Sequence, residues 1–411
     1  MSLGKPPTLF QTQTTQSLML LLVFAVTLFI AVLLSCRARE TVLSLSVLFL
    51  AAGFALGEGV FGAHTPNREF LYQIAELALY SVLFTGGINT GGLKSIRRNW
   101  REPGRALLIG MPLTIVGTAM LAHWLMQMNW TMSFLIGSVL APTDPVFVSG
   151  LFRFEAVPKR VKHVLNVESG LNDGLALPAV LIILNMAGKQ NEGFGPVLWE
   201  LVLGTVIGIG IPAIGVRLEK SHLFGAAGLF QRLNAFALGL IVLAVAEVTN
   251  ANLFLAAFSA GVTIATLSQP VTKAFHEFGE LIGELLKLAA LLIFGARIAP
   301  VLFAAMPWSY YVFAGLAVFA VRPVAILISF FKSGAPRREV LTIGWFGPKG
   351  FASVVYALMV LNVGTSATNE AARVTGLAVA ASILIYSSTD ILVGRRFERQ
   401  AKASQREQEA A

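Results

Sequence analysis

Long apolar runs dominate this chain and restrict what it can fold into. A run of about 20 apolar residues is long enough to cross about 30 Å of hydrocarbon as a helix. Thirteen such runs follow one another along the sequence. They lie at residues 17–36, 41–60, 70–90, 104–125, 131–151, 163–187, 196–216, 233–249, 252–268, 278–296, 308–331, 340–361 and 372–393. The pattern predicts an all-α polytopic membrane protein with thirteen transmembrane helices.

The composition leaves little room for a soluble part. Only 13% of the residues are charged, whereas soluble domains have about 25%. We therefore expect one transmembrane domain over residues 1–394 and a short charged tail over 395–411, which is either helical or disordered. The single cysteine, Cys36, excludes a disulfide within the chain, and no Cys/His spacing suggests a metal centre. We expect no cofactor.

Basic residues are concentrated in alternate connections between the apolar runs. One set of connections, together with the tail, holds 23 of the 31 Lys and Arg residues, whereas the opposite set with the N-terminus holds five. The rich set comprises residues 37–40, 91–105, 152–162, 217–232, 269–277, 332–339 and the tail. Positive residues favour the cytoplasmic side, so the distribution predicts a multi-pass protein of the inner (plasma) membrane with the N-terminus outside and the C-terminus in the cytoplasm. This distribution also disfavours a nucleic-acid partner, although the net charge is +9.

The first apolar run has a second interpretation. The letters "LLSC" at 33–36 resemble a lipoprotein cleavage box, and an apolar run after Lys5 can be a signal peptide. Arg37 and Arg39 follow the run, however, and this is the wrong polarity for export of the segment that comes next. The flanking charges favour a membrane span.

Two of the predicted spans contain helix breakers. "APTDP" interrupts the fifth span at 141–145, and "GWFGPKG" interrupts the twelfth at 344–350. Breaks in corresponding spans of two halves indicate a transporter built from inverted repeats, with two broken helices that cross at mid-membrane. Asp144, inside the first break, either compensates the dipoles of the facing helix ends or binds a cation directly.

A second polar group lies in the sixth span, in "NVESGLNDGLALP" at 166–178. Helical spacing places its four polar residues on two adjoining faces. These residues are Glu168, Ser169, Asn172 and Asp173. Ionisable side chains inside a membrane are costly and mark an ion path, a proton relay or a structural pair. A carboxylate in a closed cavity holds either a proton or a cation, and this competition couples the two fluxes when access alternates.

Five stretches together carry a family resemblance. "TDP" and "ESGLND", with "LFTGGINTGGL", "VRPVA" and "GWFGPKGFAS", resemble NhaP-type sodium/proton antiporters, which carry Asn-Asp in the core. The resemblance implies an NhaA-like antiporter fold, with a dimerisation bundle and a core bundle, assembled as a homodimer. It also implies a transporter rather than an enzyme, which exchanges Na⁺ or Li⁺ for H⁺ by alternating access.

The same resemblance implies roles for individual residues. Asp173 corresponds to the aspartate that binds the ion and carries the proton, and Asn172 to the asparagine beside it. Ser169, Thr143 and Asp144 correspond to groups that line the cation site. The expected Na⁺ ligands are thus Asp173, Asp144, Ser169 and Thr143.

Five further residues have expected roles near this site. Glu168 is expected to form a structural ion pair with Arg322 of "VRPVA". Thr85 stands where relatives often have a glutamate that contacts the cation, which is a departure from the family pattern. Lys349 either neutralises carbonyl groups at the second break or snorkels. Lys287 is expected to pair within its own helix, with Glu280 or Glu284.

The residues also bear on stoichiometry and on competing functions. Asn172 is neutral and Arg322 does not lose its proton, so one proton per cation is expected, without net charge movement. A K⁺/H⁺ antiporter of the same fold is the main alternative. A cation channel and an intramembrane aspartyl protease remain as other classes, because an acidic cavity or two aspartates on neighbouring spans would suit them as well.

Overall fold

The computed structural model describes residues 9–38, 45–57, 68–98, 100–144, 149–152, 154–187, 194–221, 229–303 and 306–410. Its regular elements are helices, and each predicted apolar run coincides with one helix or one interrupted helix. The first half contains α1 (Leu9–Ala38), α2 (Leu45–Leu56), α3 (Arg68–Asn89), α4 (Gly92–Arg98), α5 (Arg101–Arg105), η1 (Ala106–Gly110), α6 (Met111–Met126), α7 (Trp130–Leu140), α8 (Ser149–Phe152) and α9 (Lys159–Ala187). The second half contains α10 (Phe194–Glu219), α11 (Leu229–Val248), α12 (Leu253–Leu267), α13 (Gln269–Phe303), α14 (Trp308–Leu316), η3 (Ala317–Val321), α15 (Arg322–Ser329), α16 (Arg337–Trp345), α17 (Phe351–Val363) and α18 (Ser366–Ala410).

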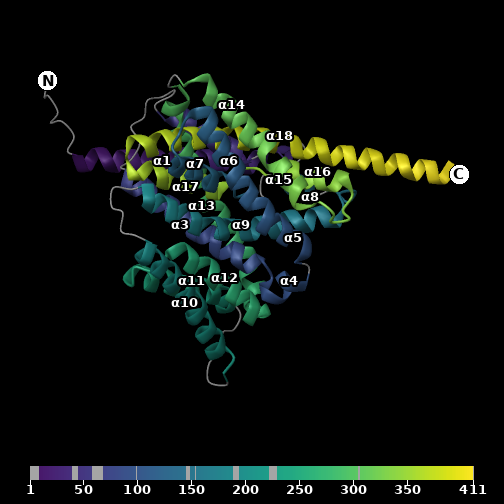
Figure 1. Ribbon diagram of the computed structural model, residues 1–411. Coiled ribbons are helices and arrows are strands. Elements are labelled where there is room, and N and C mark those ends of the chain that lie inside the picture. Colours follow the sequence, from purple (N-terminus) through teal and green to yellow (C-terminus); the bar gives the residue numbers. More distant parts are fainter. Residues whose placement is uncertain are drawn as a thin grey trace.

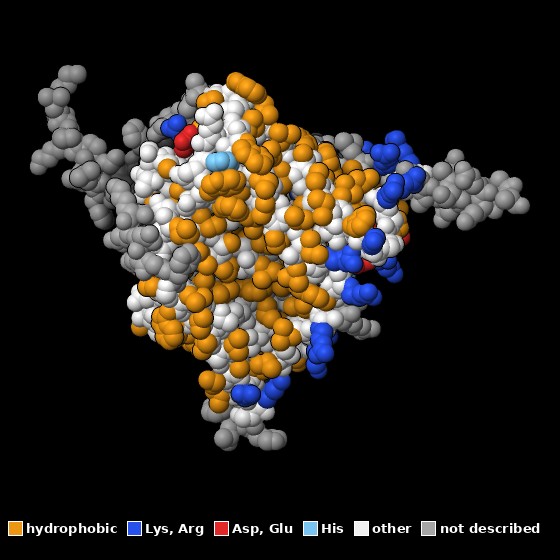
Figure 2. All heavy atoms as spheres, in the orientation of Figure 1, with side chains coloured by type: hydrophobic (Ala, Val, Ile, Leu, Met, Phe, Trp, Pro, Cys, Tyr) orange, Lys and Arg blue, Asp and Glu red, His pale blue; other side chains and the backbone are white. Residues whose placement is uncertain are grey.

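Within the described residues, four continuous helical segments are by themselves long and apolar enough to cross a bilayer. They are Arg101–Met126, Lys159–Ala187, Gly195–Glu219 and Trp308–Ser329. Large apolar side chains cover much of the outer surface, as Figure 2 shows. An apolar exterior of this extent is expected of a protein whose solvent is lipid. The total of thirteen crossings stays a prediction, since length and composition identify four of them within the described residues.

The two ends of the helical bundle differ in charge. In Figure 2, Lys and Arg side chains gather on the side from which the end of α18 leaves the bundle. The beginning of α1 lies on the opposite side (Figure 1). This arrangement agrees with an odd number of crossings and with the charge distribution along the sequence. Residues 395–410 continue α18 as a helix that projects from the bundle.

Small residues allow α3 to pack closely against α12. A Cβ atom added at Gly87 would lie 2.5 Å from the Phe258 carbonyl oxygen, and one at Gly261 would lie 2.2 Å from the Phe84 carbonyl oxygen. Membrane helices use such residues because their association depends on close backbone contact. The contact holds the C-terminal part of α3, with Thr85, in a defined place beside α9 and α13.

The two interrupted helices cross at their breaks. The backbone N–H of Asp144, at the first break, donates to the Pro348 carbonyl at 3.1 Å. The Ser353 hydroxyl, in the first turn of α17, donates to the Val139 carbonyl at 2.7 Å. These contacts confirm the predicted crossing and satisfy backbone groups that the breaks expose. Pro145, which belongs to the first breaker motif, lies outside the described residues.

Glycine makes the crossing possible. A Cβ atom at Gly350 would lie 1.9 Å from the Cβ of Asp144, so a larger side chain would force the two breaks apart. Polar side chains complete the junction: the Lys349 N–H donates to the Ser382 hydroxyl of α18 at 2.7 Å. The relation of the two halves as inverted repeats stays a prediction.

Candidate ion-binding site

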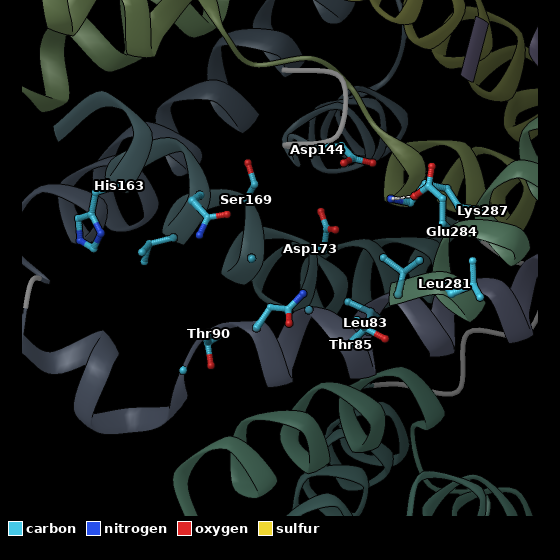
Figure 3. A pocket seen from close by; sticks show the side chains of 18 residues that line it. Leu83, Thr85, Thr90, Asp144, His163, Ser169, Asp173, Leu281, Glu284 and Lys287 are labelled. Carbon is cyan, nitrogen blue, oxygen red and sulfur yellow. Dashed lines mark ion pairs between the residues drawn. The ribbon is translucent and has the colours of Figure 1, made fainter. Parts of the chain in front are cut away.

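A cavity of about 740 Å³ lies beside the crossing of the two interrupted helices. Its walls come from α3, from the first break, from the first half of α9 and from α13 (Figure 3). The charged and hydroxyl-bearing groups that line it are Thr85, Thr90, Asp144, His163, Ser169, Asp173, Glu284 and Lys287. Four of the predicted site residues, Thr85, Asp144, Ser169 and Asp173, therefore share one cavity.

Asp173 projects into this cavity from α9 (Figure 3). Its side chain is half-buried, and no hydrogen bond within the described part of the chain reaches its carboxylate. Its backbone is held in place, because the Tyr356 hydroxyl of α17 donates to the Asp173 carbonyl at 2.8 Å. A carboxylate that is positioned through its backbone, with its own oxygens facing a cavity, can take up a proton or a cation.

Asp144 is placed where it could fill either role that the sequence left open. Its Oδ2 accepts a hydrogen bond of 3.2 Å from the backbone N–H of Phe351, the first residue of α17. A negative side chain at a helix N-terminus offsets the positive end of the helix dipole. The same carboxylate lines the cavity opposite Asp173.

Thr143 and Asn172 lie behind the cavity wall, and the hydrogen bonds between them connect two of the segments that form this wall. The Asn172 side-chain amide donates to the Thr143 hydroxyl at 2.7 Å and to the Thr143 carbonyl at 3.3 Å. The hydroxyls of Thr143 and Ser169 are 3.4 Å apart. Asn172 thus ties the first break to α9. Among the neutral residues of the predicted cation site, Ser169 faces the cavity, whereas Thr143 and Asn172 do not line it.

Glu168 and Arg322 form a fully buried ion pair. Arg322 donates from Nη1 to Oε1 of Glu168 at 2.7 Å and from Nη2 to Oε2 at 2.9 Å. Their side chains are 2% and 3% exposed, respectively. A π-helical turn over Ala317–Val321 leads into Arg322, and the following Pro323 removes a helical donor at this point. The pair faces away from the cavity and joins α9 to α15.

Lys349 lies beside this ion pair rather than in the cavity. It is 1% exposed and is in electrostatic contact with Arg322 and Glu168. Within the described residues, its Nζ makes no hydrogen bond. The Glu168 carboxylate therefore lies beside two buried basic side chains, and this position of Lys349 differs from the two that the sequence suggested.

Lys287 is a cavity residue that the sequence did not identify as such. Its Nζ lies 3.4 Å from Oε2 of Glu284, one turn earlier on α13, as the expected in-helix pairing requires. It also lines the cavity together with Asp144 and Asp173. The Glu280 side chain lies outside the described residues. The sequence feature that could have identified Lys287 as a cavity residue is its position inside an apolar run. A charged residue in a membrane is costly and therefore indicates a function.

Thr85 occupies the α3 side of the cavity. It is 8% exposed, and its hydroxyl makes no hydrogen bond within the described part of the chain. The departure from the family pattern therefore lies at the site itself, where a neutral hydroxyl faces the cavity.

The cavity reaches one side of the bundle. From Asp173 it continues to the end of α3, at Thr90 and Gly91, and to the first turns of α9, at His163 and Asn166. These segments adjoin the basic connections 91–105 and 152–162. The cavity thus extends from the middle of α9 towards the basic side.

Crossed helix breaks beside a cavity lined by carboxylates are the arrangement with which secondary transporters bind ions at mid-membrane. The chain belongs to the sodium/hydrogen exchanger family. The family model described as "Sodium/hydrogen exchanger, transmembrane" matches residues 23–391. This membership agrees with the resemblance found in the sequence and with an integral membrane protein.

Curated relatives carry related names. The K(+)/H(+) antiporter NhaP of Alkalimonas amylolytica is 25% identical over 336 residues, which cover 80% of this chain and 58% of the relative. The K(+)/H(+) antiporter NhaP2 of Shewanella baltica (strain OS223) is 24% identical over 372 residues, covering 88% and 63%. The chain thus spans about three fifths of the length of these relatives.

A solved structure supports the fold. The sodium proton antiporter MjNhaP1 from Methanocaldococcus jannaschii at pH 8 superposes with a TM-score of 0.75 and covers 94% of this chain and 99% of that one. The sequence identity is 15%, so the likeness concerns the fold alone. The predicted antiporter fold is confirmed.

Proposed function

We propose that this protein exchanges a monovalent cation for a proton by alternating access, with Asp173 as the site at which the two compete. The observation that carries the proposal is the Asp173 carboxylate, which faces a cavity beside two crossed helix breaks. A single carboxylate with one open approach holds one positive charge at a time. Release of the proton is then required for cation binding, and the reverse holds on the other side of the membrane.

Oxygen atoms from the first break and from α9 support the cation-binding part of this proposal. Asp144, Ser169 and Asp173 place carboxylate and hydroxyl oxygens around one cavity. Oxygens are the ligands that hard cations prefer. Thr143 and Asn172 contribute by holding the first break against α9. The Na⁺ site proposed here therefore consists of Asp173, Asp144 and Ser169, with Thr143 adjacent.

The basic side of the bundle is proposed to be cytoplasmic, in the inner (plasma) membrane. Lys and Arg side chains on that side support this orientation. On this proposal the cavity opens to the cytoplasm, as in an inward-open state. We further propose a homodimer built through a dimerisation bundle, on the strength of the family resemblance.

K⁺/H⁺ exchange is the second candidate function. Two observations favour it: the relatives cited above are named K(+)/H(+) antiporters, and Thr85 leaves the α3 wall of the cavity without a carboxylate. A site with less negative charge discriminates less strongly in favour of small, strongly hydrated ions, because it repays less of their dehydration cost.

Cation-dependent proton movement is the first expected result. In proteoliposomes with an imposed pH gradient and a pH-sensitive dye, addition of Na⁺, Li⁺ or K⁺ to the purified full chain should dissipate the gradient, whereas choline should not. The order of the three responses identifies the transported cation. Flux that follows voltage alone would indicate a channel, and absence of any cation-dependent change would contradict antiport.

Exchange should also be insensitive to membrane potential. Asn172 is neutral, and Arg322 is bound to Glu168 and does not lose its proton, so only Asp173 is assigned to proton exchange. One proton per cation moves no net charge. The test imposes a K⁺/valinomycin potential of either sign and follows Na⁺-driven proton movement. A rate that changes steeply and directionally with voltage would contradict one-for-one exchange.

A further inference from the structure

Lys287 brings into the ion cavity a positive charge that the proposed exchange does not use. The residue lies near the middle of α13 and is 7% exposed. Burial of an ammonium group is costly unless carboxylates or hydrogen bonds compensate it. Its partners therefore decide what the cavity can bind.

Carboxylates lie on two sides of Lys287. On its own helix, Glu284 is 3.4 Å from the ammonium nitrogen, and the Glu284 side chain is 37% exposed. Across the cavity, Asp144 and Asp173 line the same space as Lys287, and their charges act on it through that space. Figure 3 shows Lys287 extending from α13 towards these two aspartates.

The other residues that line the cavity add little charge. The α3 wall contributes Thr85, which is neutral, and the remaining titratable side chain is His163, towards the basic side. The charges that face Lys287 are therefore Asp144 from the first break, Asp173 from α9 and Glu284 from α13. A cation that enters the cavity meets a positive charge already in place.

We propose that the Lys287 ammonium is a tethered competitor of the transported cation and sets the affinity of the site. This inference rests on the proposed function. Without a bound cation the ammonium moves towards Asp144 and Asp173 and offsets part of their charge. When the cation binds, the ammonium pairs with Glu284, and this second position is the one that the structure shows. A lysine suits this exchange of partners because its four-carbon stem is flexible and its charge is compact. Lys287 keeps its proton throughout, so exchange remains one-for-one.

The proposed movement of the ammonium predicts that substitutions at Lys287 and at Glu284 change the cation affinity in opposite directions. Removal of the ammonium leaves the aspartates without an internal cation, so an external cation should bind more tightly. Removal of the Glu284 charge takes away the alternative partner, so the ammonium should stay with the aspartates and the cation should bind more weakly. A purely structural role for the Glu284–Lys287 pair would weaken binding in both cases.

The experiment compares Lys287→Met and Glu284→Gln with the wild-type full chain. Binding is measured as the Na⁺ concentration at the midpoint of thermal stabilisation, with choline chloride keeping ionic strength constant, at a pH alkaline enough to remove proton competition. We expect Lys287→Met to lower the midpoint about tenfold, which corresponds to about 1.4 kcal/mol, and Glu284→Gln to raise it. The KM for Na⁺ in proteoliposomes should change in the same directions.

Two controls complete the design. Lys273→Met removes the same charge from the exposed start of α13, and its midpoint should equal that of the wild type. Lys287→Arg retains the charge and should not lower the midpoint. An unchanged midpoint in Lys287→Met, a tenfold lower midpoint in Lys287→Arg, or shifts of equal sign in Lys287→Met and Glu284→Gln would overturn the inference. Failure of the proposed function would show in the wild type itself, as absence of both Na⁺-dependent stabilisation and cation-driven proton movement.

Discussion

Asp173→Asn is expected to reduce cation-driven proton movement to the level of protein-free liposomes. The substituted amide has almost the same size, but it neither exchanges a proton nor balances the charge of a cation. The fold should survive, since the hydrogen bond from Tyr356 goes to the Asp173 backbone carbonyl, which the substitution leaves in place. Asp173→Ala should be equally inactive.

Dye-based flux in proteoliposomes checks this result, together with thermal melts that verify folding. Glu155→Gln is a suitable control, because it neutralises an exposed carboxylate in the connection between α8 and α9, outside the cavity. Its flux should equal that of the wild type. Retained cation-dependent flux in either Asp173 variant would remove Asp173 from the centre of the mechanism.

Glu168→Gln is expected to lower the free energy of unfolding by about 3–5 kcal/mol, the usual cost of breaking a buried ion pair. The geometry adds an asymmetry. Loss of Glu168 leaves Arg322 and Lys349 buried together without their carboxylate, whereas loss of Arg322 leaves Glu168 beside Lys349. Glu168→Gln should therefore destabilise more than Arg322→Gln, and the double variant less than the sum of the two.

Thermal and denaturant melts in detergent measure these differences. Arg160→Gln serves as the control, since Arg160 forms ion pairs with Glu102 at 3.1 Å and Glu339 at 3.5 Å while its side chain is 39% exposed. Ion pairs that water reaches contribute only about 0–1 kcal/mol, so this variant should lose much less stability than Glu168→Gln. Strictly additive losses at Glu168 and Arg322 would contradict a direct pair.

The helices and their interruptions were predictable from the sequence because their causes are local. The length of an apolar run decides whether that run can cross the membrane as a helix. Proline and glycine interrupt a helix at their own positions, and the breaks before α8 and α17 lie at the motifs that predicted them. The side of each connection follows from its own Lys and Arg residues. Asp173 was recognisable because a carboxylate inside an apolar run is rarely accidental.

The contents of the cavity were decided by tertiary packing. Whether a polar side chain faces the cavity or a neighbouring helix depends on helices that are distant in the sequence. Lys287 is an in-helix partner of Glu284 by its spacing, and it becomes a cavity residue only because α13 packs beside α3 and the first break. Asn172, next to Asp173 in the chain, binds Thr143 behind the wall, and Lys349 lies against Arg322 and Glu168. The sequence by itself thus determined which charges enter the membrane, whereas the packing of the helices decided which of them meet, because electrostatic contact depends on distance in space and not along the chain.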